Sequence, residues 1–125
     1  MSIAIKEPRE LRNIYSRRFD HLADYRNRIW CVLVREFFQR YVRDTDRVID
    51  LGCGYGEFIN HVRCGKKYGM DLNPQSPQHL APEVQFLHHD CATAWPLPAE
   101  SLDVVFTSNF FEHLPDKLAL KLTLL

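Results

Sequence analysis

The sequence predicts an α/β fold in which a parallel sheet is preceded by N-terminal helices. Four short, largely apolar segments of strand length alternate with helical or loop connections. A turn with three alternate glycines, Gly52, Gly54 and Gly56, directly follows the first of these segments. The last segment, 102–108, is almost continuously apolar, as strands buried in a parallel sheet are. These observations indicate strands joined by crossovers, with a tight turn at the end of the first strand.

The chain before residue 47 is predicted to be helical. Apolar side chains at three-and-four spacing predict a helical turn or two over 10–23. A stronger helix is predicted over 24–42, where a broad apolar stripe occupies one side. We expect this stripe to pack against the sheet, and its members are Ile29, Trp30, Leu33, Val34, Phe37, Phe38, Tyr41 and Val42. Residues 1–46 would then be an N-terminal helical segment packed on the sheet, and residues 47–125 would supply the strands.

Strands are predicted at 47–51, 67–71, 84–88 and 102–108. After the first strand and its glycine turn, a helix should run from about Glu57 to Gly65, because glycine suits the position just beyond a helix end. The proline-interrupted stretch 73–78 predicts a loop or a short irregular helix. Two prolines within 90–101 exclude a long regular helix there. A last helix is predicted over 114–125.

Composition and charge bound the class of protein. With 125 residues the chain has room for one domain and one core. Sixteen basic and sixteen acidic side chains cancel, so overall charge draws the protein neither to nucleic acid nor to an anionic membrane. Residues 1–50 carry 11 basic and 8 acidic side chains, and residues 51–125 carry 5 and 8. The half that follows the first strand is therefore the acidic half, which suits a cationic ligand.

No segment predicts export or a membrane span. Charge and proline interrupt the first residues before an apolar signal sequence can form, and the longest apolar run, 30–34, is far shorter than the roughly 20 residues that cross a membrane. The four cysteines, Cys31, Cys53, Cys64 and Cys91, include no Cys-x-x-Cys pair, which indicates reduced thiols and no metal site. We therefore expect a cytoplasmic protein.

The three-glycine turn is suited to holding a ligand, because backbone without side chains can approach it closely. Its spacing, Gly-x-Gly-x-Gly, differs from the Gly-x-Gly-x-x-Gly of dinucleotide sites. Asp50 just before the turn and Glu57 just after it should oppose a phosphate group. No Lys-Ser or Lys-Thr pair closes the turn, as it does in nucleoside triphosphatases. A ligand with a cationic head fits better.

Four motifs stand in order along residues 47–116: Asp-Leu-Gly-Cys-Gly-Tyr-Gly at 50–56, Tyr-Gly-Met-Asp-Leu at 68–72, Phe-Leu-His-His-Asp-Cys at 86–91, and the block 95–116. Together they resemble class I S-adenosylmethionine-dependent methyltransferases, and the last resembles the small-molecule branch of that family. The resemblance implies a Rossmann-like, three-layer fold with strand order 3-2-1-4 and S-adenosylmethionine as cofactor. It also makes residues 47–125 the cofactor-binding half of the domain. Members of the family continue with further strands, so we expect this chain to be truncated after its fourth strand.

The resemblance places a cofactor site at the carboxyl ends of the strands, where such sheets bind their ligands. Asp50 would receive the ammonium group of the cofactor, Asp71 the two ribose hydroxyls, and Asp90 the adenine amino group. The cofactor-binding residues that it implies are Asp50, Gly52, Cys53, Gly54, Tyr55, Gly56, Asp71, Leu72, Asp90, Cys91, Asn109 and Phe110. The residues alone leave open that Asp50 is a solvated aspartate and that Asp71 and Asp90 cap the turns that follow them.

The same resemblance gives the remaining positions their roles. Leu72 would lie against the adenine face, and the Cys91 backbone N–H would reach a ring nitrogen. Asn109 and Phe110 would border the sulfonium, with loop packing as their alternative. The Arg17-Arg18 and Tyr25-Arg26 clusters of the N-terminal helices would form part of a lid over the site, with solvated surface arginines as the alternative.

Methyl transfer from a sulfonium needs no catalytic nucleophile, because positioning and desolvation supply most of the acceleration. His113 is a candidate base, with structural capping as its alternative. The acceptor would be a small or lipid-like molecule that the sequence does not identify. Two other functions stay open: a non-catalytic S-adenosylmethionine-binding module or truncated pseudo-enzyme, and, less favoured, an NAD-dependent oxidoreductase. The apolar edge at 104–106 predicts a dimer or a partner that covers it.

Overall fold

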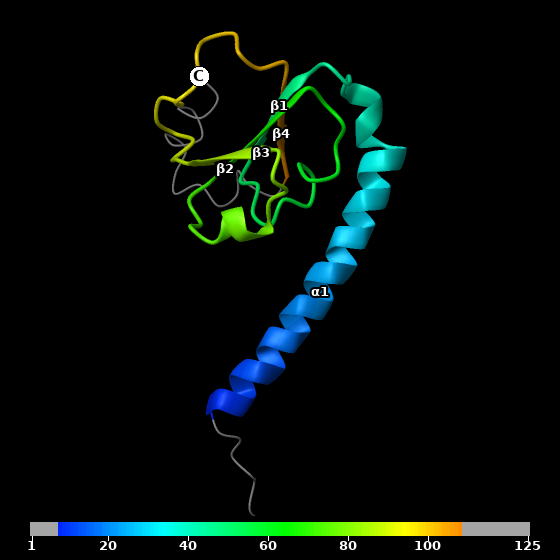
Figure 1. Cartoon of the computed structure of the whole chain (residues 1–125), viewed down its shortest axis with the longest axis vertical. Helices are drawn as coiled ribbons and strands as arrows, with labels where there is room; N and C mark the ends of the chain where they lie inside the picture. Colours follow the sequence, from blue (N-terminus) through cyan, green and yellow to red (C-terminus); the bar gives the residue numbers. More distant parts are fainter. Residues whose placement is uncertain (1–7, 109–125) are drawn as a thin grey trace, which may run out of the picture.

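The computed structural model describes residues 8–108, with side chains from Leu22 onward. Its centre is a four-stranded parallel sheet in the order β3-β2-β1-β4 (Figure 1). The strands are β1 (Arg47–Leu51), β2 (Lys66–Asp71), β3 (Val84–His88) and β4 (Val104–Thr107). This arrangement is a Rossmann-like α/β fold, and it confirms the predicted fold class and strand order.

The register of the sheet brings the carboxyl ends of the strands to one edge. Asp50, near the end of β1, is paired with Gly69 of β2 on one side and with Phe106 of β4 on the other. Asp71 at the end of β2 is paired with His88 at the end of β3. Side chains that follow each strand therefore meet along this edge, as the sequence predicts.

One continuous helix, α1 (Pro8–Glu36), precedes the sheet, followed by a short 3₁₀ helix, η1 (Phe38–Tyr41). The prediction of two helices, the second ending at residue 42, was wrong in two respects. The helix is continuous, and it ends at Glu36. No glycine or proline lies within 9–36 to break the helix, and proline is tolerated in the first turn where Pro8 stands. The predicted end at residue 42 is too late, because Phe37 leaves the helical region at φ −127° and the chain tightens into η1.

Among the α1 side chains that the structure describes, those in the core lie in its carboxyl-terminal turns. Trp30 and Val34, with Phe38 and Val42 beyond the helix, pack into a core with Val48 and side chains of the segment after the glycine turn. The other half of the predicted stripe is exposed to solvent: Ile29 by 40%, Leu33 by 40%, Phe37 by 47% and Tyr41 by 68%. The expectation that the whole stripe packs on the sheet was therefore wrong. Figure 1 shows the amino-terminal part of α1 projecting beyond the sheet.

The segment after the glycine turn is not the regular helix predicted between Glu57 and Gly65. It forms consecutive turns, with Asn60 N donating to Gly56 O at 2.9 Å and Val62 N to Phe58 O at 3.1 Å. The side chain of Asn60 is occupied elsewhere, since its Nδ2 donates to His79 O and its Oδ1 accepts from Ala81 N, both at 2.8 Å. Asparagine is a weak helix former, and so short a segment cannot propagate a helix by itself.

The connections after β2 and β3 follow the sequence prediction. The proline-interrupted stretch contains a short irregular helix, η2 (Ser76–His79). Residues 89–103 form no helix in the described structure and cover the face of the sheet opposite α1, where Trp95 packs on the core around Ile49 and Met70. The indole N–H of Trp95 donates to Cys91 O at 2.8 Å, which fixes this loop.

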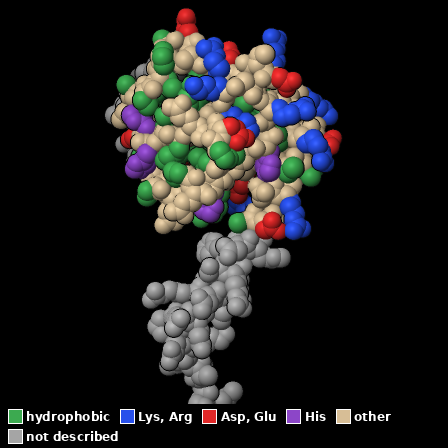
Figure 2. Space-filling model, viewed as in Figure 1, with side chains coloured by type: hydrophobic (Ala, Val, Ile, Leu, Met, Phe, Trp, Pro, Cys, Tyr) green, Lys and Arg blue, Asp and Glu red, His purple; other side chains and the backbone are tan. Residues whose placement is uncertain are grey.

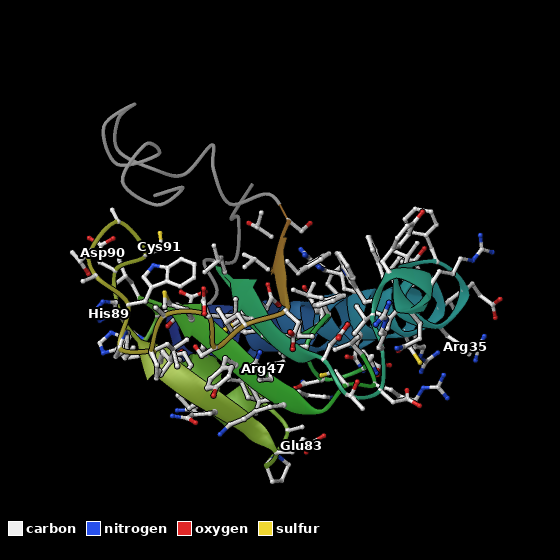
Figure 3. All side chains as sticks on the ribbon, turned by 90° about the horizontal axis from the view of Figure 1, so that it is seen from above. Arg35, Arg47, Glu83, His89, Asp90 and Cys91 are labelled. Carbon is white, nitrogen blue, oxygen red and sulfur yellow. The ribbon has the colours of Figure 1, made fainter. Side chains whose placement is uncertain are left out.

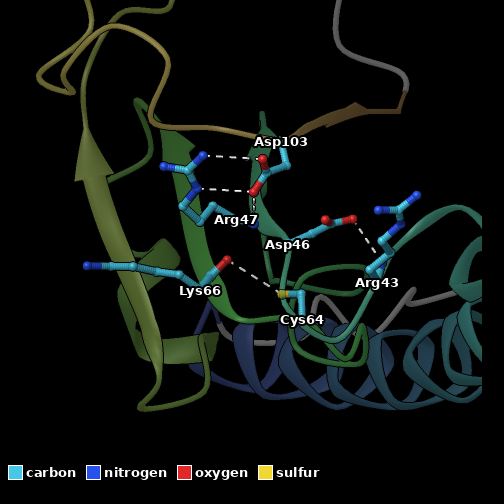
Figure 4. Close-up of polar contacts among 6 residues, drawn as sticks. All are labelled: Arg43, Asp46, Arg47, Cys64, Lys66 and Asp103. Carbon is cyan, nitrogen blue, oxygen red and sulfur yellow. Dashed lines mark hydrogen bonds and ion pairs between the residues drawn. The ribbon is translucent and has the colours of Figure 1, made fainter.

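The starts of β1 and β4 are joined by a clamp at the amino-terminal end of the strands, away from the glycine turn (Figure 4). Asp103 Oδ2 accepts from Arg47 N at 2.8 Å and from Arg47 Nε at 3.1 Å, and Asp103 Oδ1 accepts from Arg47 Nη2 at 3.2 Å. Strand β4 is shorter than the predicted 102–108, and the side chain of Val105 is 52% exposed, so it is not buried on both faces. A partner that covers the exposed side of β4 stays a prediction.

Three expectations lie outside the described residues. These are the helix over 114–125, the site residues Asn109 and Phe110, and the candidate base His113. Within 8–108, no helix combines the length and the apolar character that crossing a membrane requires.

Candidate functional site

The glycine turn after β1 is held by backbone hydrogen bonds to the neighbouring strand. Gly52 N and Cys53 N both donate to Met70 O, at 2.8 and 3.1 Å, and Gly56 N closes the turn onto Cys53 O at 2.8 Å. The three glycines have positive φ angles of 69°, 52° and 77°, a region that residues with a Cβ rarely occupy. The chain therefore reverses sharply at the carboxyl edge of the sheet.

Two of these glycines face different surroundings. A Cβ on Gly54 would meet nothing within 4 Å, so this backbone faces open space. A Cβ on Gly56 would lie 2.7 Å from both Asn60 Nδ2 and Leu80 Cδ2, inside the packed structure. Gly54 is thus the position where the turn presents bare backbone outward.

A cavity of about 410 Å³ lies against the turn, within the range of about 300–1,000 Å³ typical of small-molecule sites. Its wall combines the end of β1, the glycine turn, α1 and the end of β4. The lining residues are Arg26, Trp30, Asp50, Gly52, Cys53, Gly54, Tyr55, Glu57, Phe58, Phe106 and Ser108. Of the predicted site residues, the cavity brings together Asp50, Gly52, Cys53, Gly54 and Tyr55, while Gly56 shapes the turn behind it.

Asp50 is the most unusual group of this cavity. Its side chain is only 4% exposed, which excludes the solvated aspartate that the sequence left open. Burial raises the pKa of its carboxyl well above the usual range, and the nearby carboxylates of Asp71 and Glu57 raise it further. Within the described residues no group donates a hydrogen bond to it. A buried carboxyl whose pKa is raised further by two neighbouring carboxylates favours a cationic ligand.

Cys53 does not supply nucleophilic chemistry at this site. Burial raises the pKa of its thiol, and the carboxylates of Asp50 and Asp71 add to the effect. The thiol therefore stays protonated at neutral pH, and the thiolate is the reactive form of cysteine. Its Sγ lies against Gly69, where a Cβ would come within 3.0 Å, so Cys53 fills the space between the turn and β2.

Asp71 at the end of β2 holds the turn and its own loop together. Its Oδ2 accepts from Gly54 N and its Oδ1 from Asn73 N, both at 2.8 Å. The turn-capping alternative considered for Asp71 is thus present in the structure. Each carboxylate oxygen has a second acceptor position, so these bonds leave capacity for ligand hydroxyls.

The predicted adenine contacts lie further along the same edge. Asp90 and Cys91 follow β3 and lie together in the loop that Figure 3 shows at the end of the sheet away from Arg35. Asp90 Oδ1 accepts from Ala92 N at 2.9 Å, which is the turn-capping geometry left open for it. The Cys91 side chain belongs to the core, and Leu72 is 60% exposed. None of these three residues lines the cavity.

Sequence reasoning missed several lining residues, because they come from distant parts of the chain. Arg26 was considered only as part of a lid, yet its Nε lies 3.0 Å from Glu57 Oε1 at the cavity wall. The aromatic side chains of Trp30, Phe58 and Phe106 also line the cavity, with the last two stacked at 3.6 Å between ring centroids. Their apolar character predicted core positions and gave no signal of a site.

A second hollow of about 310 Å³ adjoins this cavity and shares Tyr55 and Glu57 with it. The rings of Tyr55 and His79 are 4.0 Å apart between centroids and form part of its wall. Its lining is mainly polar and comprises Ala23, Asp24, Asn27, Tyr55, Glu57, Asn60 and His79. On the face of the molecule in Figure 2, acidic side chains lie among the Lys and Arg side chains, so charge there is mixed.

Comparison with known families and structures relates this chain to methyltransferases. A family model described as a methyltransferase domain matches residues 21–123. No curated protein matches the chain. Among solved structures, a SAM-dependent methyltransferase from Thiobacillus denitrificans in complex with S-adenosyl-L-homocysteine is similar, with 24% identity and a TM-score of 0.45. The similarity covers 68% of this chain and 36% of that protein, so the chain spans little more than a third of its length.

Proposed function

Because the chain belongs to the family of methyltransferase domains, we propose that its cavity binds S-adenosylmethionine and that the protein methylates a small or lipid-like acceptor. One observation carries the proposal. The Asp50 carboxyl is buried on the cavity wall beneath the glycine turn, and its charged neighbours Asp71 and Glu57 are acidic. Such a site favours a cationic ligand and opposes a phosphorylated one.

The cavity matches the amino-acid end of this cofactor. Asp50 would receive the ammonium group, with Glu57 adding negative charge nearby. Arg26 would receive the carboxylate, because its guanidinium is the cation that lines this wall within the described residues. Gly54 would admit the ligand close to the backbone, since a Cβ there would enter open space.

The nucleoside end would extend along the carboxyl edge of the sheet. Asp71 would accept the ribose hydroxyls on the acceptor positions that its backbone bonds leave open. Leu72 would cover the adenine face, Asp90 would bind the amino group, and the Cys91 backbone N–H would reach the ring. Asn109 and Phe110 keep their proposed place beside the sulfonium.

Methyl transfer requires the protein mainly to position the cofactor and the acceptor and to exclude water from the reacting groups. When bound, S-adenosylmethionine supplies a methyl group on a cationic sulfonium. Trp30, Phe58 and Phe106 would exclude water from that group, and their ring faces favour a cation. His113 remains the candidate for accepting a proton from the acceptor.

The second hollow supports a place for the acceptor. It shares a wall with the proposed cofactor cavity and has hydrogen-bonding groups from α1, the glycine turn and η2. This lining favours a polar small molecule over a lipid as the acceptor. A non-catalytic cofactor-binding module is the second candidate, and an NAD-dependent oxidoreductase is disfavoured by the three carboxylates near the turn. A cytoplasmic location remains our prediction, supported by the free thiols of Cys31, Cys53 and Cys64.

Calorimetric titration tests the cofactor. S-adenosylhomocysteine should bind, and NAD should not. Arg26→Gln should weaken S-adenosylhomocysteine about tenfold, because it removes a charged contact worth about 1.5–3 kcal/mol, partly replaced by the amide. The same variant should bind 5′-methylthioadenosine as wild type does, since that nucleoside lacks the amino-acid group.

Asp44→Asn is the matched control, because Asp44 is exposed and lies before β1, at the opposite end of that strand from the turn. Binding of NAD in preference to S-adenosylhomocysteine would refute the proposed cofactor. Equal losses for both nucleosides in Arg26→Gln would refute the assigned role of Arg26. Transfer of labelled methyl to any acceptor would separate an enzyme from a binding module.

A further inference from the structure

The second hollow differs from the cofactor cavity in the charges that it offers to a ligand. Asp24 and Glu57 contribute carboxylates to its wall, and none of the described residues that line it is Lys or Arg. Asp24 pairs with Arg28 at 2.8 Å and Glu57 pairs with Arg26 at 3.0 Å, but neither arginine belongs to the lining. A ligand in this hollow therefore meets carboxylate oxygens and no guanidinium of the described chain.

The neutral side chains of the lining leave few donors for a ligand. Both polar ends of Asn60 are bonded to backbone in and after η2, and Asn27 Oδ1 lies 2.8 Å from His61 Nε2. The rings of Tyr55 and His79, tilted by 32° with centroids 4.0 Å apart, add aromatic surface, which attracts cations. Carboxylate oxygens and aromatic faces together suit an ammonium group.

We propose that the methyl acceptor is a small amine and that its nitrogen receives the methyl group in this hollow. The inference rests on the proposed function, because the hollow shares Tyr55 and Glu57 with the cavity assigned to the cofactor. An acceptor bound in the hollow would lie across this shared wall from the sulfonium. Alkyl amines are protonated at neutral pH, so the carboxylates can recognise the acceptor before it reacts.

Methyl transfer to nitrogen moves positive charge toward the carboxylates of the hollow. The bound ammonium first gives one proton to water, since the hollow is partly open to solvent at Tyr55, which is 42% exposed. The freed lone pair forms the new N–C bond while the C–S bond breaks and leaves its electron pair on sulfur. The sulfonium becomes a neutral thioether, and the methylated nitrogen becomes cationic. Carboxylates beside that nitrogen stabilise the charge as it develops.

The same lining opposes an oxygen acceptor. A hydroxyl gains nucleophilic strength by approaching the oxyanion, and nearby carboxylates disfavour an anion. Molecules that carry a carboxylate or phosphate beside the reacting atom would be repelled in the same way. The hollow therefore selects nitrogen over oxygen and cationic acceptors over anionic ones.

Cofactor binding should strengthen this preference through Arg26. In the free protein its Nε lies 3.0 Å from Glu57 Oε1. In the proposed complex the same guanidinium also donates to the cofactor carboxylate, so Glu57 is less neutralised. More of its charge is then left for the acceptor.

Cofactor analogues with a side arm test the acceptor class by calorimetric titration of the full chain. In each analogue a nitrogen atom replaces the sulfonium sulfur, and an aminopropyl, butyl or carboxyethyl group replaces the methyl. The aminopropyl analogue should bind at least about tenfold more tightly than the butyl analogue, because its ammonium gains a charge-assisted contact. The carboxyethyl analogue should bind more weakly than the butyl one. Wild-type protein alone gives this order.

Asp24→Asn should remove most of the aminopropyl gain and leave S-adenosylhomocysteine affinity unchanged, because Asp24 lines the hollow and not the cavity. Asp44→Asn should keep the wild-type order. Equal affinities for the aminopropyl and butyl analogues, or tightest binding of the carboxyethyl analogue, would overturn the amine acceptor. A full aminopropyl gain in Asp24→Asn would overturn its placement in this hollow. If S-adenosylhomocysteine itself does not bind, the proposed function fails and the acceptor with it.

Discussion

At the scale of the residue, Asp50 lowers the stability of the free protein, and the same burial favours binding of a cationic ligand. Its carboxyl is removed from water without a hydrogen-bond donor in the described structure, and acidic neighbours oppose its ionisation. A ligand cation would relieve both penalties at once. Groups that destabilise the free protein often persist at binding sites for this reason.

Asp50→Asn should therefore stabilise the free protein and abolish binding. We expect the free energy of unfolding at pH 7 to rise by about 0.5–2 kcal/mol. The raised pKa of Asp50 means that its favourable contribution is complete below the unfolded pKa, about 3.9, and is lost as pH rises toward the folded value. Urea unfolding from pH 4 to 8 should thus show wild type losing stability relative to the variant as pH rises.

The control for this experiment is Asp44→Asn, whose pH profile should follow wild type. A constant difference between Asp50→Asn and wild type across the pH range would contradict the role given to burial. Undiminished affinity of Asp50→Asn for S-adenosylhomocysteine would contradict the role given to the cation.

Gly54 and Gly56 offer a matched pair of substitutions. Gly54→Ala should cost about 1–2 kcal/mol of stability, the strain of a Cβ at φ 52°. Gly56→Ala should cost more, about 2–4 kcal/mol, because its Cβ also collides with Asn60 and Leu80. Thermal unfolding gives this order, and titration of folded Gly54→Ala should show at least about tenfold weaker S-adenosylhomocysteine binding. Wild-type affinity in Gly54→Ala would remove the turn from the contact surface.

The sequence predicts those site residues that stand beside its motifs. Asp50 and the glycines are contiguous, and Asp71 ends a strand whose position is clear from its pattern. Arg26 and Trp30 reach the cavity only because α1 packs beside the segment that follows the glycine turn, a contact between residues far apart in sequence. No local pattern encodes that contact, so a sequence without its fold shows an exposed arginine and a core aromatic residue.

At the scale of the element, the strands were predicted more closely than the helices. The bounds of β1 and β3 agree with the prediction, and β2 begins one residue earlier, because buried strands end where polar residues and turns begin. Helix bounds depended on tertiary contacts. The side chain of Asn60 bonds to η2, where a regular helix was predicted after the glycine turn. Phe38 packs against the core, where α1 was predicted to continue.

The clamp between β1 and β4 predicts an acid-sensitive contact. Hydrogen bonds from the Arg47 side chain and backbone lower the pKa of Asp103. The stability that it contributes is present above the unfolded pKa, about 3.9, and is lost as pH falls through the folded value. Asp103→Asn should therefore be less stable than wild type at pH 7, and the difference should shrink below pH 4. Urea unfolding at both pH values measures it, and a difference that grows on acidification would refute the clamp.

At the scale of the molecule, the chain combines a packed sheet with a helix that extends past it. The family and the strand order were predicted from four motifs, and both predictions are confirmed, whereas the S-adenosylmethionine cofactor stays a proposal. The projection of α1 was not predicted, because an apolar stripe marks a buried face without saying what buries it. Half of the stripe meets the sheet and half faces solvent.

The middle of α1 is tied to the glycine turn region by two neighbouring contacts. Arg26 pairs with Glu57, and Asn27 Oδ1 lies 2.8 Å from His61 Nε2. A shift of this helix would therefore move Glu57, which lines the cavity directly after the turn. Binding of any partner that shifts this helix and occupancy of the cavity would then be thermodynamically linked, and each would change the equilibrium constant of the other by the same factor.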